Sequence, residues 1–197
     1  MFCFACTGGI GTGKSYVVRI FSALGVPAYI ADDRAKELYE IDRNLLDRLI
    51  EVLGDKIVVD GVLQKSVMAG IIFSNKELLM KVNRIVHPRL LEDFYQWRDN
   101  QEKKGVDMIV YESAIFLETP TFRSIADKVI VVTAPLDVRI RRVIKRDKVD
   151  EKLVIQRINK QWSDEKRLKM ADFIIFADGK RAVLPQILRI IDEVKKK

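Results

Sequence analysis

The sequence has few cysteines and histidines, with two cysteines and one histidine in 197 residues. Two cysteines cannot build a disulfide framework. Cys3 and Cys6 form an isolated C-x-x-C pattern inside a short apolar segment, whereas zinc would need two further ligands and a redox pair would sit at a helix N-terminus. We therefore expect two reduced cysteines packed in a strand, and no metal or redox role for them.

Long hydrophobic runs are also missing. Runs such as residues 108–111 and 129–132 are interrupted well before the roughly 20 residues that a membrane span needs. The N-terminus carries no basic stretch and no cleavage site, so no secretory signal is expected. With 48% hydrophobic and 32% charged residues, the chain has the composition of a globular protein with one core. The sequence predicts a cytoplasmic protein that is not embedded in a membrane.

Acidic residues are outnumbered by basic ones, 28 to 35, which gives a net charge of +7. Residues 139–169 hold twelve basic and five acidic side chains, so this one segment contains an excess as large as that of the whole chain. A basic balance can indicate nucleic acid, an acidic surface or an anionic substrate. Nucleic-acid binding is the weaker hypothesis, because the charge is confined to one segment in which Trp162 is the only aromatic residue.

The hydrophobic pattern predicts strands that alternate with helices. Residues 2–7 are typical of a buried strand, and residues 14–24 of a helix that Gly25 ends. A second strand is expected at residues 27–31, with a helix from Asp33 onward. Later strands are predicted at 108–111, 129–133 and 173–176, before a final amphipathic helix. Such alternation indicates an α/β fold with a parallel sheet covered on both faces.

Two segments depart from simple strand-helix alternation. From residue 33 to 104 the pattern is mostly helical and too long for a crossover, so it predicts a helical insertion. We expect a capping box at Ser74 and Glu77, a turn at Asp60-Gly61, and a second interruption at His87-Pro88. The basic segment has few apolar stretches, which favours a partly exposed helical lid.

Glycine is concentrated at one point, with four of the ten glycines at positions 8 to 13. The stretch Gly8-Gly9-Ile10-Gly11-Thr12-Gly13-Lys14-Ser15 matches G-x-x-x-x-G-K-[ST] in full, between a predicted strand and a predicted helix. In this motif backbone N–H groups and the helix dipole surround phosphate oxygens. Lys14 would reach the β- and γ-phosphates and Ser15 would hold Mg²⁺. The alternative is a glycine-rich turn without a ligand.

Asp32 and His87 are candidate substrate residues. Asp32 follows the second predicted strand, whose carboxyl end borders the same crevice as the phosphate loop, so it could accept a proton from a hydroxyl group. A helix N-cap is the equal alternative, and Asp33 fits either role as well. His87, the single histidine, is either a half-buried residue at a helix end or a substrate contact, and one histidine alone makes a poor metal site.

Arg139, Arg142 and Arg146 are spaced by three and four residues, which aligns them on one helix face. A solvated basic face is the common explanation for such spacing. In a protein with a phosphate loop, the same face could close over a triphosphate and neutralise charge during transfer.

Taken together, the motifs resemble the dephospho-CoA kinase family over nearly the whole chain. The matching pieces, in order, are Thr7 to Ser15, Leu24-Gly25, Ala31-Asp32, His87-Pro88, Ala114 to Glu118, Arg142 with Arg146-Asp147, Arg157-Ile158 with Gln161, and Ala171-Asp172. The resemblance implies transfer of the ATP γ-phosphoryl group to the ribose 3′-hydroxyl of dephospho-CoA, the last step of coenzyme A synthesis. Its implied ligands are ATP, Mg²⁺ and the small-molecule substrate, with no nucleic acid or membrane partner.

The resemblance also implies a P-loop nucleoside-kinase fold in three parts. Residues 1–32, 105–135 and 170–197 would form the core, residues 33–104 the helical domain for dephospho-CoA, and residues 136–169 the lid. The implied catalytic residues are Asp32, Lys14 and Arg142, the substrate contacts Thr7, Asp32 and His87, and the metal ligand Ser15. The implied ATP site comprises Gly8, Gly9, Ile10, Gly11, Thr12, Gly13, Lys14, Ser15, Tyr16, Arg142 and Arg146.

Several positions depart from the family pattern, among them the stretch from Ala114 to Glu118, which stands where the family has Pro-Leu-Leu-Phe-Glu. Ile30 stands where the family often has a second Asp, and Ala177 stands where an Asn is common after the last strand. A P-loop kinase that acts on another small hydroxyl substrate, such as a nucleoside monophosphate or a sugar, is the alternative function, because it would share the phosphate loop and the lid.

Overall fold

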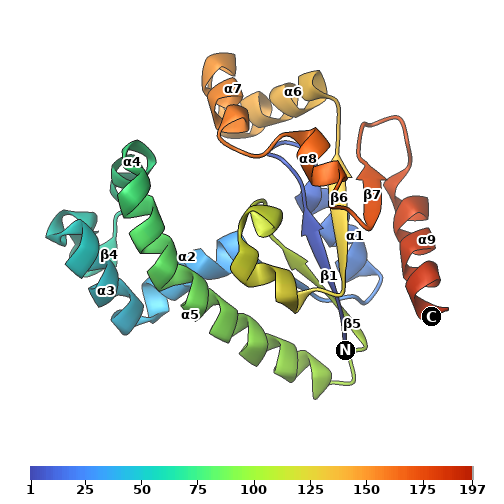
Figure 1. Ribbon diagram of the computed structural model, residues 1–197, viewed down its shortest axis with the longest axis horizontal. Helices are drawn as coiled ribbons and strands as arrows, with labels where there is room; N and C mark the ends of the chain where they lie inside the picture. The colour runs from blue at the N-terminus through green and yellow to red at the C-terminus, as the bar shows by residue number, and fades with distance from the viewer. Residues whose placement is uncertain (197) are drawn as a thin grey trace. The chain divides into compact units, whose positions relative to one another are not determined.

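The computed structural model describes residues 1–196 (Figure 1). For Phe73 it describes only the backbone. The strands are β1 (Phe2–Thr7), β2 (Ala28–Ile30), β3 (Val58–Val59), β4 (Val62–Leu63), β5 (Met108–Glu112), β6 (Lys128–Thr133) and β7 (Phe173–Phe176). The α-helices are α1 (Lys14–Ala23), α2 (Ala31–Ile41), α3 (Arg43–Leu53), α4 (Lys65–Ser74), α5 (Lys76–Glu102), α6 (Leu136–Asp147), α7 (Glu151–Asn159), α8 (Asp164–Leu168) and α9 (Val183–Lys195). Short 3₁₀ helices are η1 (Asp55–Ile57), η2 (Phe116–Glu118) and η3 (Pro120–Ile125).

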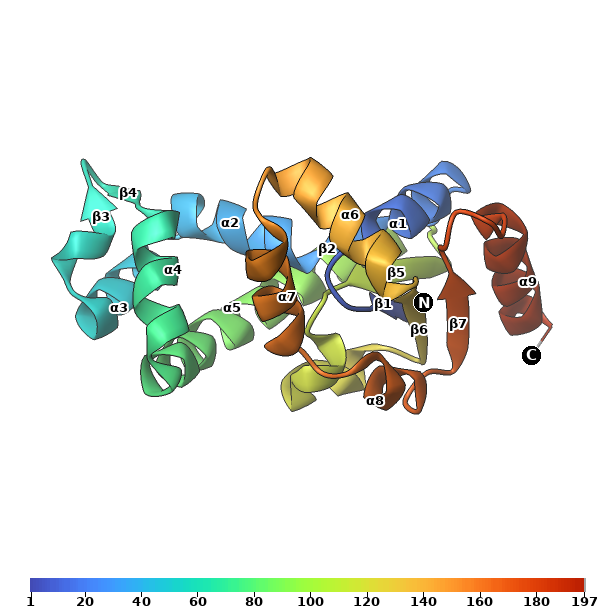
Figure 2. The same cartoon turned by 90° about the horizontal axis from the view of Figure 1, so that it is seen from above.

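A five-stranded sheet in the order β2-β5-β1-β6-β7 forms the centre of the fold. β1 pairs in parallel with both β5 and β6, and β6 pairs in parallel with β7. Figure 2 shows α1 on one side of this sheet, and α8 with the segment that follows β5 on the other. The near-continuous apolar sequence of β5 and β1 follows from this arrangement, since both faces of these strands are covered. The α/β prediction is confirmed.

The chain divides into two compact units, one made of residues 1–29 and 101–197, and the other of residues 30–100. The first unit contains the phosphate loop, the basic segment and nearly all of the sheet. The chain passes between the units twice, after Tyr29 and after Asn100.

Aromatic side chains fill the core of the first unit. Tyr29 stacks on Tyr111 with ring centres 5.4 Å apart, and Phe122 lies 5.7 Å from the same ring. Cys3 and Cys6 are buried in β1, as the sequence predicts, and burial raises the pKa of the Cys6 thiol above its usual range. These side chains give β1 and β5 a rigid base from which the loops at their carboxyl ends extend.

The second unit is held by an apolar face and by ion pairs. Leu45, Leu46, Leu49 and Leu53 on α3 are all buried. Asp42 caps this helix, because its Oδ1 accepts the Leu45 N–H at 3.0 Å while its Oδ2 pairs with Arg89 of α5.

Two local predictions in the second unit are wrong, and a third is confirmed. α5 runs without interruption through Pro88, because its buried side chains on both sides of the proline outweigh the lost hydrogen bond. Ser74 does not cap a helix: its hydroxyl donates to the Gly70 and Ile71 carbonyls, and Asn75 caps α5 instead. The predicted turn at Asp60-Gly61 is confirmed: it joins β3 and β4 as a hairpin, with positive φ at both residues.

One edge of the large sheet is covered by a side chain. Gln186 of α9 accepts the Phe176 N–H at 2.9 Å and donates to the Phe176 carbonyl at 3.1 Å. Its amide therefore occupies the positions that a neighbouring strand would use along β7. Among residues 1–196, no helix is both long enough and apolar enough to traverse a lipid bilayer.

Candidate active site

The loop between β1 and α1 takes its conformation from its glycines. Gly11 and Gly13 have φ values of 78° and 102°, which favour glycine, and Gly13 is the N-cap of α1. A Cβ atom on Gly9 would overlap the Arg139 guanidinium, and one on Gly11 would overlap the Arg139 carbonyl. The glycines are thus required twice, for the loop conformation and for close packing against α6.

Lys14 lies folded against the inner side of this loop. Its Nζ donates to the Gly8 carbonyl at 3.0 Å and to the Gly9 carbonyl at 3.3 Å. The carboxylate of Glu112 lies 4.0 Å from the same nitrogen. The ammonium group is therefore held where the phosphate groups of a nucleotide would be neutralised.

Glu112 is a site residue that our sequence analysis missed. It ends β5, is only 5% exposed, and lies beside Cys6 of β1 in the register of the sheet. A buried acid at the carboxyl end of a strand next to the phosphate-loop strand is a recognisable signal, because P-loop enzymes hold Mg²⁺ with such a carboxylate. The segment Met108–Glu112 shows this pattern, since it is an apolar strand whose last residue is acidic.

A cavity of about 340 Å³ opens beside the loop, which is within the range of small-molecule sites. Its lining is Gly11, Gly13, Lys14, Ser15, Tyr16, Arg19, Arg142, Val143, Arg146 and Ala177. Seven of these residues belong to the predicted ATP site. Arg19, Val143 and Ala177 were not assigned to it from the sequence.

Arg142 is fixed in the wall of this cavity. It donates to the Thr12 carbonyl at 3.2 Å, the Gly11 carbonyl at 3.4 Å and the Ala177 carbonyl at 2.7 Å. Ala177, where an Asn is common in the family pattern, therefore contributes its backbone to the site. Arg146 also lines the cavity and bonds Asp147 at 2.6 Å, which keeps the Asp147 pKa below its usual value.

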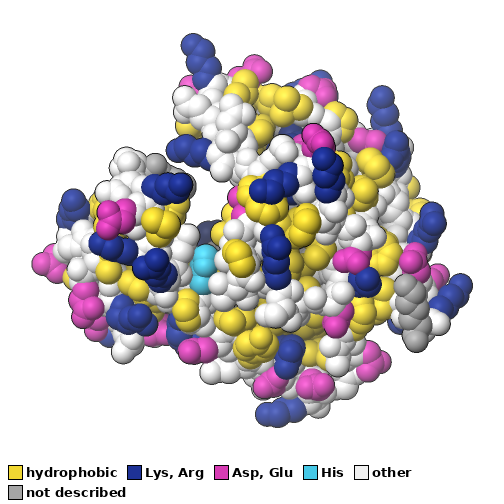
Figure 3. Space-filling view, in the orientation of Figure 1, with side chains coloured by type: hydrophobic (Ala, Val, Ile, Leu, Met, Phe, Trp, Pro, Cys, Tyr) yellow, Lys and Arg dark blue, Asp and Glu magenta, His cyan; other side chains and the backbone are white. Residues whose placement is uncertain are grey.

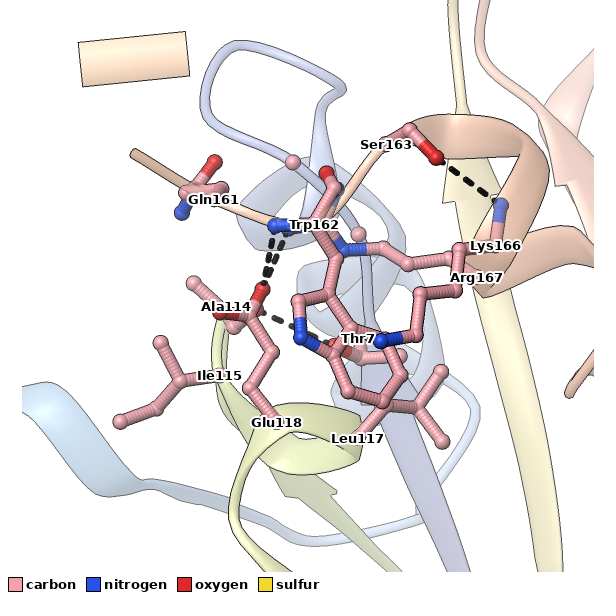
Figure 4. Close-up of polar contacts among 12 residues, drawn as sticks. Thr7, Ala114, Ile115, Leu117, Glu118, Gln161, Trp162, Ser163, Lys166 and Arg167 are labelled. Carbon is pink, nitrogen blue, oxygen red and sulfur yellow. Dashed lines mark hydrogen bonds and ion pairs between the residues drawn. The ribbon is translucent and has the colours of Figure 1, made fainter. Parts of the chain in front are cut away.

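Arg139 differs from the other two arginines. It is only 2% exposed, and its Nε donates to the Ile10 carbonyl at 2.9 Å while the guanidinium pairs with Asp164. A solvated basic face is therefore wrong for Arg139. Thr7, at the end of β1, is also buried, and its hydroxyl donates to the Ala114 carbonyl at 3.4 Å (Figure 4).

Asp32 and His87 belong to the second unit. Asp32 is exposed in the first turn of α2, whose N-cap is Ile30, so neither Asp32 nor Asp33 is the cap. The helix begins two residues earlier than predicted, and the two acids stabilise its positive end. His87 lies inside α5 rather than at a helix end, and burial lowers the pKa of its imidazole.

Charge on the surface is mixed. On the face drawn in Figure 3, Lys and Arg side chains are interspersed with acidic and hydrophobic ones. Pairs such as Arg141 with Asp137 and Lys169 with Glu165 neutralise part of the basic segment. No group of three or more His, Cys, Asp or Glu side chains suited to a metal occurs within residues 1–196.

A parallel sheet with a G-x-x-x-x-G-K-[ST] loop between its central strand and the next helix is the architecture of the P-loop proteins, and similar solved structures place it among the P-loop kinases. Shikimate kinase from Acinetobacter baumannii shares the fold, with a TM-score of 0.54 at 13% identity over 100% of this chain and 94% of the other. A dephospho-CoA kinase from Campylobacter jejuni is more similar, with a TM-score of 0.70 at 25% identity over 98% and 97%. A crystal structure of a Thermus thermophilus protein has a TM-score of 0.84 to this chain at 25% sequence identity, and the match covers 98% of this chain and 96% of the other.

Sequence comparison identifies the family. The model of the dephospho-CoA kinase family matches residues 2–182. The dephospho-CoA kinase of Bacteroides fragilis is 37% identical over 94% of this chain and 89% of the relative, and that of Porphyromonas gingivalis is 36% identical over 100% and 96%. The chain belongs to the dephospho-CoA kinase family, a family of ATP-dependent kinases, which confirms the resemblance.

Proposed function

We propose that this protein transfers the γ-phosphoryl group of ATP to the ribose 3′-hydroxyl of dephospho-CoA, the last step of coenzyme A synthesis. The observation that carries the proposal is the phosphate loop, with Lys14 held inside it, in a chain that matches the family over residues 2–182. The buried thiols of Cys3 and Cys6 fit the cytoplasmic location that we propose for the reaction.

The nucleotide would occupy the phosphate loop and the adjoining cavity. We assign its triphosphate to the stretch from Gly8 to Tyr16, where loop N–H groups and the N-terminus of α1 favour negative charge. On nucleotide binding, the Lys14 ammonium group would give up its hydrogen bonds to the Gly8 and Gly9 carbonyls and donate to the β- and γ-phosphates instead. This exchange neutralises the charge that builds up on the transferred group and its leaving oxygen.

Arg142 and Arg146 would contact the same nucleotide from α6. The three carbonyl acceptors of Arg142 hold its guanidinium in the cavity wall, which supports a binding role. A catalytic role for Arg142 would require these bonds to break as the lid, residues 136–169, closes. Arg146 is exposed and its described contacts are with the neighbouring Asp147, so its guanidinium is accessible to a phosphate group.

Ser15 and Glu112 would hold Mg²⁺. The donor set suits this ion, since Mg²⁺ in kinases is bound by one or two protein oxygens, phosphate oxygens and water. Ser15 lies in the first turn of α1 and lines the cavity, and the Glu112 carboxylate is buried beside Lys14. When bound at these residues, Mg²⁺ would offset the negative charge of the nucleotide phosphates.

The acceptor would be activated by Asp32 and held by Thr7 and His87. We propose that Asp32 accepts or orients the proton of the 3′-hydroxyl, with the helical domain of residues 33–104 receiving dephospho-CoA and residues 1–32, 105–135 and 170–197 forming the core. The support for Asp32 is its position in the first turn of α2, two residues after the end of β2, and its exposure to solvent. Burial lowers the pKa of His87 and so favours its neutral imidazole, which can both donate and accept a hydrogen bond to the substrate.

The test is ADP release from ATP and Mg²⁺ with dephospho-CoA, nucleoside monophosphates and sugars offered separately as acceptors. We expect turnover with dephospho-CoA and at least 100-fold lower kcat/KM with the others. The position of the new phosphate is then read by phosphorus NMR of the product. Preferred turnover of a nucleoside monophosphate or a sugar would instead support the alternative kinase and contradict the assigned acceptor.

A further inference from the structure

Both backbone polar groups of Ile10, in the middle of the phosphate loop, are bound by side chains of the basic segment. The Ile10 N–H donates to Gln161 Oε1 at 2.8 Å. The Ile10 carbonyl accepts from Arg139 Nε at 2.9 Å. The peptide groups on either side of Ile10 are therefore held from two directions by residues about 130 and 150 positions away in the chain.

Gln161 is itself held in place through the next residue, Trp162. Glu118 of η2 accepts the Trp162 N–H at 3.1 Å and an Arg167 N–H at 2.7 Å through the same oxygen. Arg167 also donates to the Trp162 carbonyl, so both backbone groups of Trp162 are fixed (Figure 4). Lys166 covers the Trp162 ring at 3.4 Å. The turn that presents Gln161 to the loop thus rests on Glu118.

Arg139 is fixed on the other side of Ile10. Its guanidinium pairs with Asp164, which also accepts from Arg167 at 3.5 Å. Arg139 and Arg167 are 2% and 1% exposed, so each is a buried charge that would be costly without these partners. The contacts form one continuous network from Glu118 through Arg167 and Asp164 to Arg139 and the loop.

We propose that Gln161 and Glu118 are positioning residues for nucleotide binding: Glu118 holds the turn at Trp162, and Gln161 holds the Ile10 peptide so that the loop is already shaped for phosphate. The inference rests on the proposed function. With its N–H bound to Gln161 and its carbonyl bound to Arg139, the Ile10 backbone is held in one conformation before any nucleotide binds. A loop shaped in advance binds more tightly, since less conformational freedom is lost on binding.

Calorimetric titration with MgADP tests the role of Gln161. Gln161→Met keeps the side-chain length and removes the acceptor, and we expect it to raise the Kd for MgADP about 3- to 10-fold, as loss of one hydrogen bond predicts. The thermal midpoint of the ligand-free variant should stay within about 2 °C of the wild type. Gln156→Met, an exposed residue of α7, is the matched control and should change the Kd less than 2-fold. An unchanged Kd for Gln161→Met overturns the proposal.

A double-mutant cycle tests whether Glu118 acts through Gln161. Glu118→Gln alone should raise the Kd about 3-fold or more, but should add less than 1.5-fold to Gln161→Met. Equal effects in both backgrounds would overturn the positioning role of Glu118 and leave it a residue of general stability. If Glu118→Gln is too unstable to purify, Glu118→Asp allows the same comparison, and Glu165→Gln is the control at an exposed acid of α8.

The same titrations separate this inference from the proposed function. Failure of the wild type to bind MgADP or MgATP would contradict the kinase itself. Tight binding by the wild type, with the same Kd in Gln161→Met, would contradict only the positioning network.

Discussion

Asp32 and Asp33 are adjacent acids in one helical turn with different surroundings. Both are exposed, but Asp33 pairs with Lys36 at 2.7 Å, whereas the charge of Asp32 acts on Tyr39, whose pKa is raised by burial and, to a smaller extent, by Asp32. Successive helix positions point about 100° apart, so the two carboxylates cannot replace each other at one substrate. This difference makes the pair an internal control for catalysis.

We expect Asp32→Asn to lower kcat with dephospho-CoA by about 10²- to 10⁴-fold, because an amide cannot accept the proton of the attacking hydroxyl. The KM for ATP should change less than 3-fold. Steady-state kinetics with each substrate varied in turn measures both quantities. Asp33→Asn should keep kcat within about 3-fold of the wild type, and a large loss there, with none in Asp32→Asn, would reverse the assignment.

Residues whose chemistry is local could be predicted from the sequence. The phosphate-loop glycines, Lys14 and Ser15 are contiguous, and the motif states their roles. Arg139 and Arg167 could not be recognised, because a charged residue on a basic helix looks solvated until its acidic partner is located. Their partners Asp164 and Glu118 lie 25 and 49 positions away, so only the fold reveals that both arginines are buried.

At the scale of one element, α3 depends on a single capping side chain. Asp42→Ala removes both the acceptor for the Leu45 N–H and the partner of Arg89, and we expect a loss of about 1–2 kcal/mol in the free energy of unfolding. Asp42→Asn keeps a good cap and loses only the charge, so its loss should be smaller. Urea unfolding at pH 7 measures both, and equal losses would show that the ion pair outweighs the cap.

The same aspartate gives a pH dependence whose sign is fixed. The Leu45 N–H, aided by Arg89, holds the Asp42 pKa below its usual value, so the unfolded chain takes up the proton first as the pH falls. The contribution is complete above about pH 4 and declines as the pH falls through the lower native pKa. The stability advantage of wild type over Asp42→Asn should therefore shrink below about pH 4.

Element boundaries were predictable where apolar spacing and turn chemistry agree. β1, α1 and β7 lie where the pattern predicts, since each is a short apolar or amphipathic run closed by glycine or a polar turn. α5 shows why other boundaries fail: Pro88 is a local signal to stop, while Val82, Ile85, Leu90 and Phe94 bury one continuous face on both sides of it. The free energy gained by burying this face exceeds the local cost of a proline within the helix. The local sequence pattern does not show which of these two effects is larger.

At the scale of the whole molecule, nucleotide binding is coupled to stability. MgADP at 100 times its Kd should stabilise the wild type by about 2.7 kcal/mol. For a chain of this length that corresponds to a rise of roughly 5–10 °C in the thermal midpoint. Differential scanning calorimetry measures the shift.

The same scan distinguishes Lys14 from other lysines. Lys14→Ala should lose most of the shift, because the phosphates lose their ammonium partner. Lys81→Ala, an exposed lysine paired with Glu77, should keep the full shift. A full shift in Lys14→Ala would remove this lysine from the nucleotide site.

Gln186 has a consequence for how the chain behaves in a crowded cell. A parallel sheet that ends in an open strand offers a template on which a second, partly folded chain can add its own strand. Here the amide of Gln186 already donates to and accepts from Phe176, so an incoming chain would have to displace a side chain tethered to α9. At Phe176, Gln186 therefore occupies both backbone groups to which an added strand would bond.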